Sequence, residues 1–130
     1  MKHLETLDHQ FRLADSALHH AEQLLRAKYW TSSVSNSYQV ALRAAAGLLY
    51  GLQLRPFTER EVRVAFVSAF VNSGRVPAHL DASFRSLEKM REQADYDHDY
   101  VSTEEDARRA LELAREFWTE AQRVRKEVLK

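Results

Sequence analysis

The chain has 130 residues, of which 45% are hydrophobic, enough for one domain with an ordinary core and too few for two. Nineteen basic residues balance nineteen acidic ones, so the overall charge does not indicate a nucleic-acid-binding protein. The absence of cysteine excludes a disulfide framework and a thiolate metal site. No apolar run could cross a bilayer, and Met1–Glu5 lacks a signal-peptide core. We expect one domain, residues 1–130, in the cytoplasm and without membrane contact.

The first half of the chain predicts two long helices. The first is expected over about Leu4–Tyr29, because its apolar residues recur in steps of three and four. The hydroxyl residues of Trp30–Ser33 suit the end of this helix and the capping of the next. The second helix carries one apolar face, and its centre, Ala44–Gly47, is small enough to let another helix approach closely. The two faces comprise Leu4, Leu7, Phe11, Ala14, Leu18, Ala21 and Leu25, and then Val34, Tyr38, Ala41, Ala45, Leu48 and Leu52.

A break and a short helix follow. Pro56 stops the second helix, and Thr58 with Glu61 forms a capping box that starts the third. The third helix is expected to bury Val62, Phe66, Ala69 and Phe70, and the turn residues of 72–77 end it.

Two more helices complete the predicted fold. The fourth carries Leu80, Phe84 and Leu87 on one stripe and ends near 97–100. Ser102 with Glu105 is predicted to form a capping box for the fifth, which is lined by Ala107, Ala110, Ala114, Phe117, Ala121, Val124 and Val128. Since no segment has the pattern of a strand, we predict an all-α fold, an antiparallel four-to-five-helix bundle.

The fourth helix contains one exception to its apolar pattern. Arg91 occupies the next position after Leu80, Phe84 and Leu87, where a core residue is expected. A guanidinium group on a core-facing stripe needs hydrogen-bond acceptors. Arg91 is therefore either the centre of a salt-bridge network or a group that binds an anion.

His98 gives the anion hypothesis a possible chemistry. It follows Arg91 by seven residues, which brings it back to within about 20° of the same helix face and roughly 10.5 Å further along the axis. An arginine can bind a phosphodiester through two parallel hydrogen bonds, and a histidine can move a proton near neutral pH. Together they could cleave RNA without a metal ion. The alternative is an ion-pair network, because Asp95 lies four residues after Arg91 and further aspartates flank His98.

Other residues offer weaker signals. Asn36 could help to orient Arg91 or a phosphate, but a plain helix-start residue is the better interpretation. Tyr38 is expected in the core with its hydroxyl satisfied locally. His19 and His20 point about 100° apart, which does not make a metal site. The sequence contains no phosphate-binding glycine loop, nucleophile elbow or paired-carboxylate pattern, so we expect no cofactor and no bound metal ion.

Four segments in order resemble the HEPN family (higher eukaryotes and prokaryotes nucleotide-binding). They are Ser33–Tyr38, Phe70–Gly74, the Arg-x-x-Ala-Asp-Tyr segment of 91–96, and the helix with Ala110 and Ala114 before Glu116-Phe117. The likeness extends over nearly the whole chain and is greatest to small stand-alone bacterial and archaeal members that carry the Arg-x-x-Ala-Asp-Tyr segment.

The resemblance implies a homodimer whose Arg91 and His98 face a shared cleft. Many HEPN proteins are metal-independent RNases with an arginine and a histidine separated by four to six residues, and Arg91 and His98 are separated by six. Some are toxins whose partner, a minimal nucleotidyltransferase antitoxin, modifies a tyrosine just after the histidine. Tyr100 occupies that position here, and Tyr96 is the second candidate.

Two hypotheses for the function follow. In the first, the chain is a toxin-like endoribonuclease in which Arg91 holds the RNA phosphate, His98 moves the proton, and Asn36 and Asp95 support them. In the second, it is a non-catalytic HEPN module that binds a nucleotide or a partner protein, with Arg91 in a salt-bridge network. The acidic Glu92 directly after Arg91 favours the second, and the spacing of His98 and Tyr100 favours the first.

Overall fold

A computed structural model describes residues 2–96 and 101–128 of the chain, and in these ranges the fold is a bundle of α-helices. The helices are α1 (Lys2–Arg26), α2 (Trp30–Gly51), α3 (Glu59–Phe66), α4 (His79–Tyr96) and α5 (Glu104–Val128), and a π-helical turn, η1 (Val67–Val71), extends α3. No strand occurs in the described residues, which confirms the all-α prediction. None of the helices in these ranges combines the length and apolarity that a membrane span requires.

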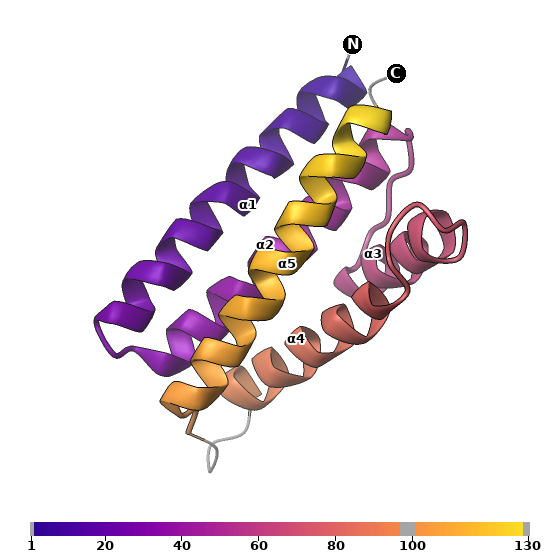
Figure 1. Ribbon diagram of the computed structural model, residues 1–130. Helices are drawn as coiled ribbons and strands as arrows, with labels where there is room; N and C mark the ends of the chain where they lie inside the picture. The colour runs from indigo at the N-terminus through magenta and orange to yellow at the C-terminus, as the bar shows by residue number, and fades with distance from the viewer. Residues whose placement is uncertain (1, 97–100, 129–130) are drawn as a thin grey trace.

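The bundle is built around α2, which packs against α1, α3, α4 and α5. Figure 1 shows α1, α2 and α5 running side by side, with α4 crossing below them and α3 on the side away from α1. Because it is surrounded, α2 buries more than the single face predicted for it: Val40, Leu42, Ala44, Ala46 and Leu49 are buried as well.

The small centre of α2 allows α1 to approach closely, as predicted. A Cβ atom added at Gly47 would lie 2.8 Å from a ring carbon of Phe11 in α1. The Phe11 ring is itself held between Trp118, at 5.4 Å between centroids, and Arg125, whose guanidinium lies 4.7 Å from the ring centroid. The absence of a side chain at Gly47 therefore allows the close approach of α1 and α2.

An aromatic cluster forms the core beneath α3 and α4. The rings of Phe66 and Phe84 lie 5.1 and 5.3 Å from that of Phe117, measured between centroids. Tyr38 from α2 adjoins Phe84 at 6.2 Å. The predicted stripe of α4 is confirmed, because Leu80, Phe84 and Leu87 are fully buried. Burying these apolar faces provides the main driving force for joining the helices.

Two predicted helix caps differ from the structure. The hydroxyl groups of Thr31–Ser33 do not cap α2, which starts at Trp30 after Tyr29 without a side-chain cap; instead, Ser33 Oγ donates to the Ala21 carbonyl in α1. At α5 the capping box lies one residue later than predicted. Thr103 Oγ1 accepts from Asp106 N, and Asp106 Oδ2 accepts from Thr103 N, whereas Ser102 is buried. The Thr58–Glu61 cap of α3 is confirmed, with 3.0 Å between Oγ1 and N.

Candidate functional site

Arg91 lies near the end of α4 and faces inward, toward α2 and α3. Its side chain is only 15% exposed, so the apolar stripe of α4 continues into a nearly buried guanidinium group. The helix positions it there by periodicity, because Arg91 is one turn beyond Leu87 on the same face. A charge in such a position needs acceptors within the protein.

Two carboxylates supply those acceptors. Arg91 Nη2 donates to Glu59 Oε2 over 2.7 Å, and Nη1 donates to Asp95 Oδ2 over 3.5 Å. Burial lowers the pKa of Arg91, but its hydrogen bond to Glu59 and the negative charge of Glu59 outweigh this effect and raise that pKa above the ordinary value. Arg91 is therefore permanently charged, and both of its terminal nitrogens bind acids.

The guanidinium group of Arg91 also lies over an aromatic ring. The guanidinium carbon lies 4.7 Å from the centroid of Tyr38, which is fully buried in α2, and 5.9 Å from the ring of Tyr96. Cations bind the faces of such rings favourably. The stacking holds the guanidinium plane in a defined orientation, and neither Arg91 Nε nor Tyr38 Oη has a hydrogen-bond partner within the described residues.

The environment of the Tyr38 hydroxyl opposes its ionisation. Burial, followed by the negative charge of Glu59, raises the pKa of Tyr38 to about 12, although the charge of Arg91 acts in the opposite direction. The prediction that Tyr38 belongs to the core is confirmed. Its hydroxyl, predicted to be satisfied locally, makes no hydrogen bond of ordinary geometry within the described residues, although it interacts with the Arg91 side chain. Tyr38 contacts Arg91 through its ring, and the Arg91 side chain also acts on the hydroxyl by lowering its pKa.

Asp95 connects this site to the beginning of α2. Its Oδ1 accepts a hydrogen bond from Ser35 Oγ over 2.8 Å while Oδ2 binds Arg91. The predicted pairing of Arg91 with Asp95 is thus observed as a contact. Asn36 instead donates from Nδ2 to the Ser32 carbonyl in its own helix, and no contact to Arg91 is observed.

We call this set of residues the Arg91 site: Ser35, Tyr38, Glu59, Arg91, Asp95 and Tyr96. A second arginine beside it provides a comparison, because Arg63 of α3 is similarly buried, at 13% exposure, and donates from Nε to Glu88 over 3.0 Å. Both arginine–glutamate pairs join α3 to α4. In one pair the arginine comes from α3 and the glutamate from α4, and in the other the arginine comes from α4 and the glutamate from α3. Only Arg91 lies in the Arg-x-x-Ala-Asp-Tyr segment.

The predicted residues His98 and Tyr100 lie outside the described residues, as do Asp97 and Asp99. Tyr96, the second tyrosine candidate, is the last residue of α4 and is 69% exposed. Its phenol is therefore accessible while its ring borders Arg91.

Several other charged groups of the described residues form ordinary surface pairs. His79 contacts Glu116, and His19 Nδ1 lies 2.8 Å from the Asp15 carbonyl oxygen. No cluster of three potential metal ligands occurs within residues 2–96 and 101–128.

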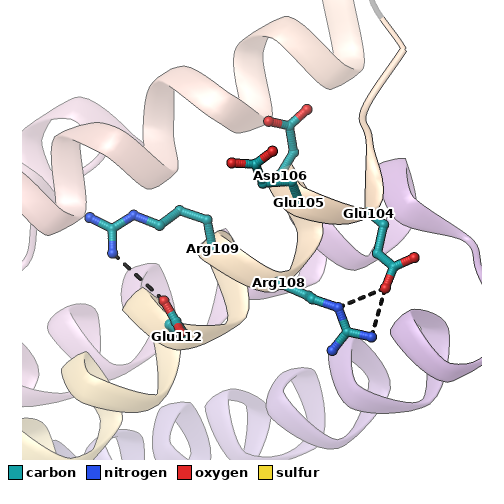
Figure 2. A pocket seen from close by; sticks show the side chains of 6 residues that line it. All are labelled: Glu104, Glu105, Asp106, Arg108, Arg109 and Glu112. Atoms are coloured by element: carbon teal, nitrogen blue, oxygen red, sulfur yellow. Dashed lines mark hydrogen bonds and ion pairs between the residues drawn. The ribbon is translucent and has the colours of Figure 1, made fainter.

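A hollow at the start of α5 is also lined by charged residues that pair with one another. Figure 2 shows the six residues that line it, all from one helix. Arg108 pairs with Glu104 at 2.7 Å and Arg109 with Glu112 at 3.8 Å. Each of the two arginines is paired with an acid of the same helix, and the four acids outnumber them. This hollow is therefore a solvated helix surface and offers no site for a phosphate.

Comparison with known families decides which protein class this site belongs to. The family model of the HEPN domain matches residues 8–124, which is nearly the whole chain and includes every residue of the Arg91 site. The chain belongs to the HEPN family. No curated protein is significantly similar to it. The HEPN domain is known for roles connected with RNA cleavage and nucleotides.

Membership of the HEPN family confirms the resemblance at the level of the family and agrees with the helical bundle. Sequence reasoning selected Arg91 and Asp95 correctly as neighbours, but it missed Glu59 and Ser35. Ser35 and Tyr38 are three residues apart and share one face of α2, whereas Asn36 is rotated by about 100° from Ser35. Its position around the helix axis, on the same face as Tyr38, could have identified Ser35 as a residue of this site. Nothing local indicates Glu59, because its partner is 32 positions away.

Proposed function

We propose that this HEPN protein is a metal-independent endoribonuclease of the toxin type, with Arg91 and His98 as its catalytic residues. The observation that carries the proposal is the state of Arg91. It is permanently charged, oriented by the Tyr38 ring and located seven residues before His98. A buried, oriented guanidinium is suited to binding two oxygens of a phosphodiester.

In the proposed reaction, Arg91 binds the non-bridging oxygens of the scissile phosphate. His98 takes the proton of the ribose 2′-hydroxyl, and that oxygen attacks the adjacent phosphorus. The bond to the 5′-oxygen breaks, and the proton that His98 took passes to this oxygen, giving a 2′,3′-cyclic phosphate, a 5′-hydroxyl end and a neutral His98 again. The charge of Arg91 stabilises the additional negative charge on the phosphoryl oxygens in the transition state.

For Arg91 to bind RNA, the phosphate must replace a carboxylate. Glu59 is the more readily displaced ligand, because its side chain is 46% exposed while that of Asp95 is 33% exposed and also held by Ser35. We propose that Glu59 occupies the phosphate position in the free protein and that RNA displaces it. Two subunits in a homodimer would bring two such sites to a shared cleft.

Regulation is proposed to follow the pattern of HEPN toxins. A minimal nucleotidyltransferase would transfer a nucleotide from ATP to the Tyr100 hydroxyl, with release of pyrophosphate, and so block the site. Tyr96 is the alternative acceptor, supported by its exposed phenol and by its ring 5.9 Å from Arg91. Coexpression with such an enzyme, followed by mass spectrometry of wild type, Tyr100→Phe and Tyr96→Phe, would identify the modified residue.

The second candidate function is a non-catalytic module that binds a nucleotide or a partner protein. It is favoured by the two ion pairs of Arg91, which already satisfy both terminal nitrogens without a ligand. In this case Arg91 would join α3 to α4, as Arg63 does.

One experiment separates the two functions. Purified wild type, Arg91→Gln, His98→Ala and Arg63→Gln are incubated with a mixed-sequence RNA in EDTA, and melting temperatures are measured in parallel. We expect wild type and Arg63→Gln to produce cyclic-phosphate ends, while Arg91→Gln and His98→Ala lose at least about 100-fold in rate. Intact RNA with wild type, or equal losses in Arg91→Gln and Arg63→Gln, would remove the catalytic role of Arg91.

A further inference from the structure

A second surface lies on the outer side of α3, facing away from the Arg91 site. Val62 and Phe66 of α3 are buried in the core, whereas Arg60 and Val64 are one turn apart on the opposite, exposed face. Glu59 contacts Arg91 from the inner side. In Figure 1, α3 is at the edge of the bundle away from α1. This helix therefore presents one face to the candidate catalytic residue and another to the surroundings.

The outer face carries an unusual amount of apolar surface. Phe57 is 95% exposed, Val64 52% and Leu54 43%. Leu54 and Val64 line a hollow together with Pro56 and Ala65. Leu54 and Val64 line this hollow directly, and Phe57 lies in the chain between two further lining residues, Pro56 and Thr58. Apolar residues grouped in this way form a patch, which is a more informative feature than isolated exposed residues.

Phe57 is exposed although the chain around it is well fixed. It precedes Thr58, the N-cap of α3, and its backbone N–H donates to Glu61 Oε2 over 2.8 Å. A residue in this position commonly packs against the fourth residue of the helix, here Val62. Val62 instead faces the core, which leaves the Phe57 ring without a packing partner at a defined place.

Positive charge borders the same hollow. Arg60 makes no ion pair with any described residue, and Arg55 makes none either, its guanidinium lying 4.8 Å from the centroid of the Tyr50 ring. The acids nearby are engaged: Glu61 accepts from Phe57 N, and Glu59 binds Arg91. The surface thus combines an apolar floor with two arginines that form no ion pair with a described carboxylate, and its one acid, Glu61, leaves the lining with an excess of positive charge.

We infer that this surface binds an acidic segment of a partner protein. A bulky apolar side chain of the partner would cover Val64 and Leu54 and contact the Phe57 ring, while its carboxylates pair with Arg55 and Arg60. Exposed aromatic and arginine side chains around an apolar centre are the composition of protein-binding surfaces. RNA fits less well, because a phosphate backbone is bound by several cations and would leave the aliphatic floor uncovered.

The test is a selection from a random-peptide display library on the immobilised full chain, with the double variant Phe57→Ala/Arg60→Glu for counter-selection. We expect enriched peptides that combine acidic with bulky apolar residues. A synthetic peptide of that sequence should bind wild type and lose about tenfold in affinity with either Phe57→Ala or Arg60→Glu alone. Arg12→Glu is the matched control, since Arg12 is an exposed arginine of α1 that also makes no ion pair with the described residues, and it should leave affinity unchanged.

Several results would overturn the inference. They are a selection without enrichment over the bare support, enriched peptides that lack acids, or affinity that Phe57→Ala leaves intact. Displacement of the peptide by a single-stranded polyuridylate would assign the surface to RNA instead. Melting temperatures of the variants exclude unfolding as the cause, and Arg60→Ala replaces Arg60→Glu if charge reversal lowers stability. RNA cleavage measured on the same variants separates this surface from the Arg91 site, which contains neither residue.

Discussion

The guanidinium carbon of Arg91 lies over the ring of Tyr38, 4.7 Å from the ring centroid, and Tyr38 is fully buried. A charged group and an aromatic ring thus meet where three helices join, because Arg91 comes from α4, Tyr38 from α2 and the first carboxylate ligand, Glu59, from α3. The contact explains how an arginine can occupy a core-facing position. Its charge is balanced at the edges, and its apolar faces are covered by the ring.

Removing the Tyr38 hydroxyl is expected to stabilise the protein. Tyr38→Phe keeps the ring beneath Arg91 and eliminates a buried hydroxyl that has no hydrogen-bond partner within the described residues. We expect the free energy of unfolding to rise by about 1 kcal/mol at neutral pH. Urea denaturation of wild type and Tyr38→Phe measures it, and a loss of stability would show that the hydroxyl is satisfied by a group outside the observed contacts.

The same pair of proteins should differ more clearly at alkaline pH. The folded-state pKa of Tyr38 is about 12, above the value near 10 of an unfolded chain. The unfolded state therefore loses its proton first, so the titration of Tyr38 leaves the free energy of unfolding unchanged below about pH 10 and lowers it as the pH rises toward 12. Over this interval the free energy of unfolding should fall more steeply for wild type than for Tyr38→Phe. Parallel slopes in urea titrations at about pH 9 and 11 would contradict the raised pKa.

Neutralising Glu59 should release Arg91 for its proposed substrate. Glu59→Gln removes the carboxylate bound to Arg91 Nη2 and a negative charge that opposes RNA. If the proposed function is correct, kcat/KM for RNA cleavage should increase roughly two- to tenfold. Glu61→Gln is the matched control, because Glu61 lies in the same helix turn but binds Phe57 N. A drop in cleavage together with the melting temperature would mark Glu59 as a structural ligand only.

Two adjacent hydroxyl residues before α5 should behave differently. Thr103→Ala deletes the acceptor of the Asp106 N–H and is expected to cost about 1 kcal/mol of stability. Ser102→Ala should be neutral or slightly stabilising, because Ser102 Oγ is buried without a partner in the described part of the chain. Thermal denaturation of both variants tests the cap, and the reverse order of effects would place the cap at Ser102.

Close packing at Gly47 should make even a methyl group costly. Gly47→Ala would bring Cβ to 2.8 Å from the Phe11 ring, which Trp118 and Arg125 hold in place, so we expect a loss of about 1–2 kcal/mol despite alanine's higher helix propensity. At Gly51, the atoms approached at 2.6 and 2.7 Å are the ends of Leu7 and Val128 side chains near the helix termini. Gly51→Ala should therefore cost less, as chemical denaturation of both variants would establish.

Much of the fold could be predicted from the sequence because it depends on local order along the helix. The spacing of Leu80, Phe84 and Leu87 determines which face of α4 is buried, and Arg91 falls on that face by the same period. The pairing of Arg91 with Asp95 is also local, since residues four apart on a helix are neighbours. Helix boundaries were less determinate: neighbouring hydroxyl residues such as Ser102 and Thr103 have similar capping ability, and the packing of the helix selects between them.

The ligands of Arg91 from other helices were decided only by the tertiary structure. Glu59, Ser35 and Tyr38 reach Arg91 or Asp95 because of the angles and rotations at which α2 and α3 pack on α4, and side-chain patterns within one helix do not contain that information. The sequence by itself determined that a charged residue would face the bundle interior. Packing between helices determined that this residue would rest on a tyrosine with a carboxylate from a third helix at its edge.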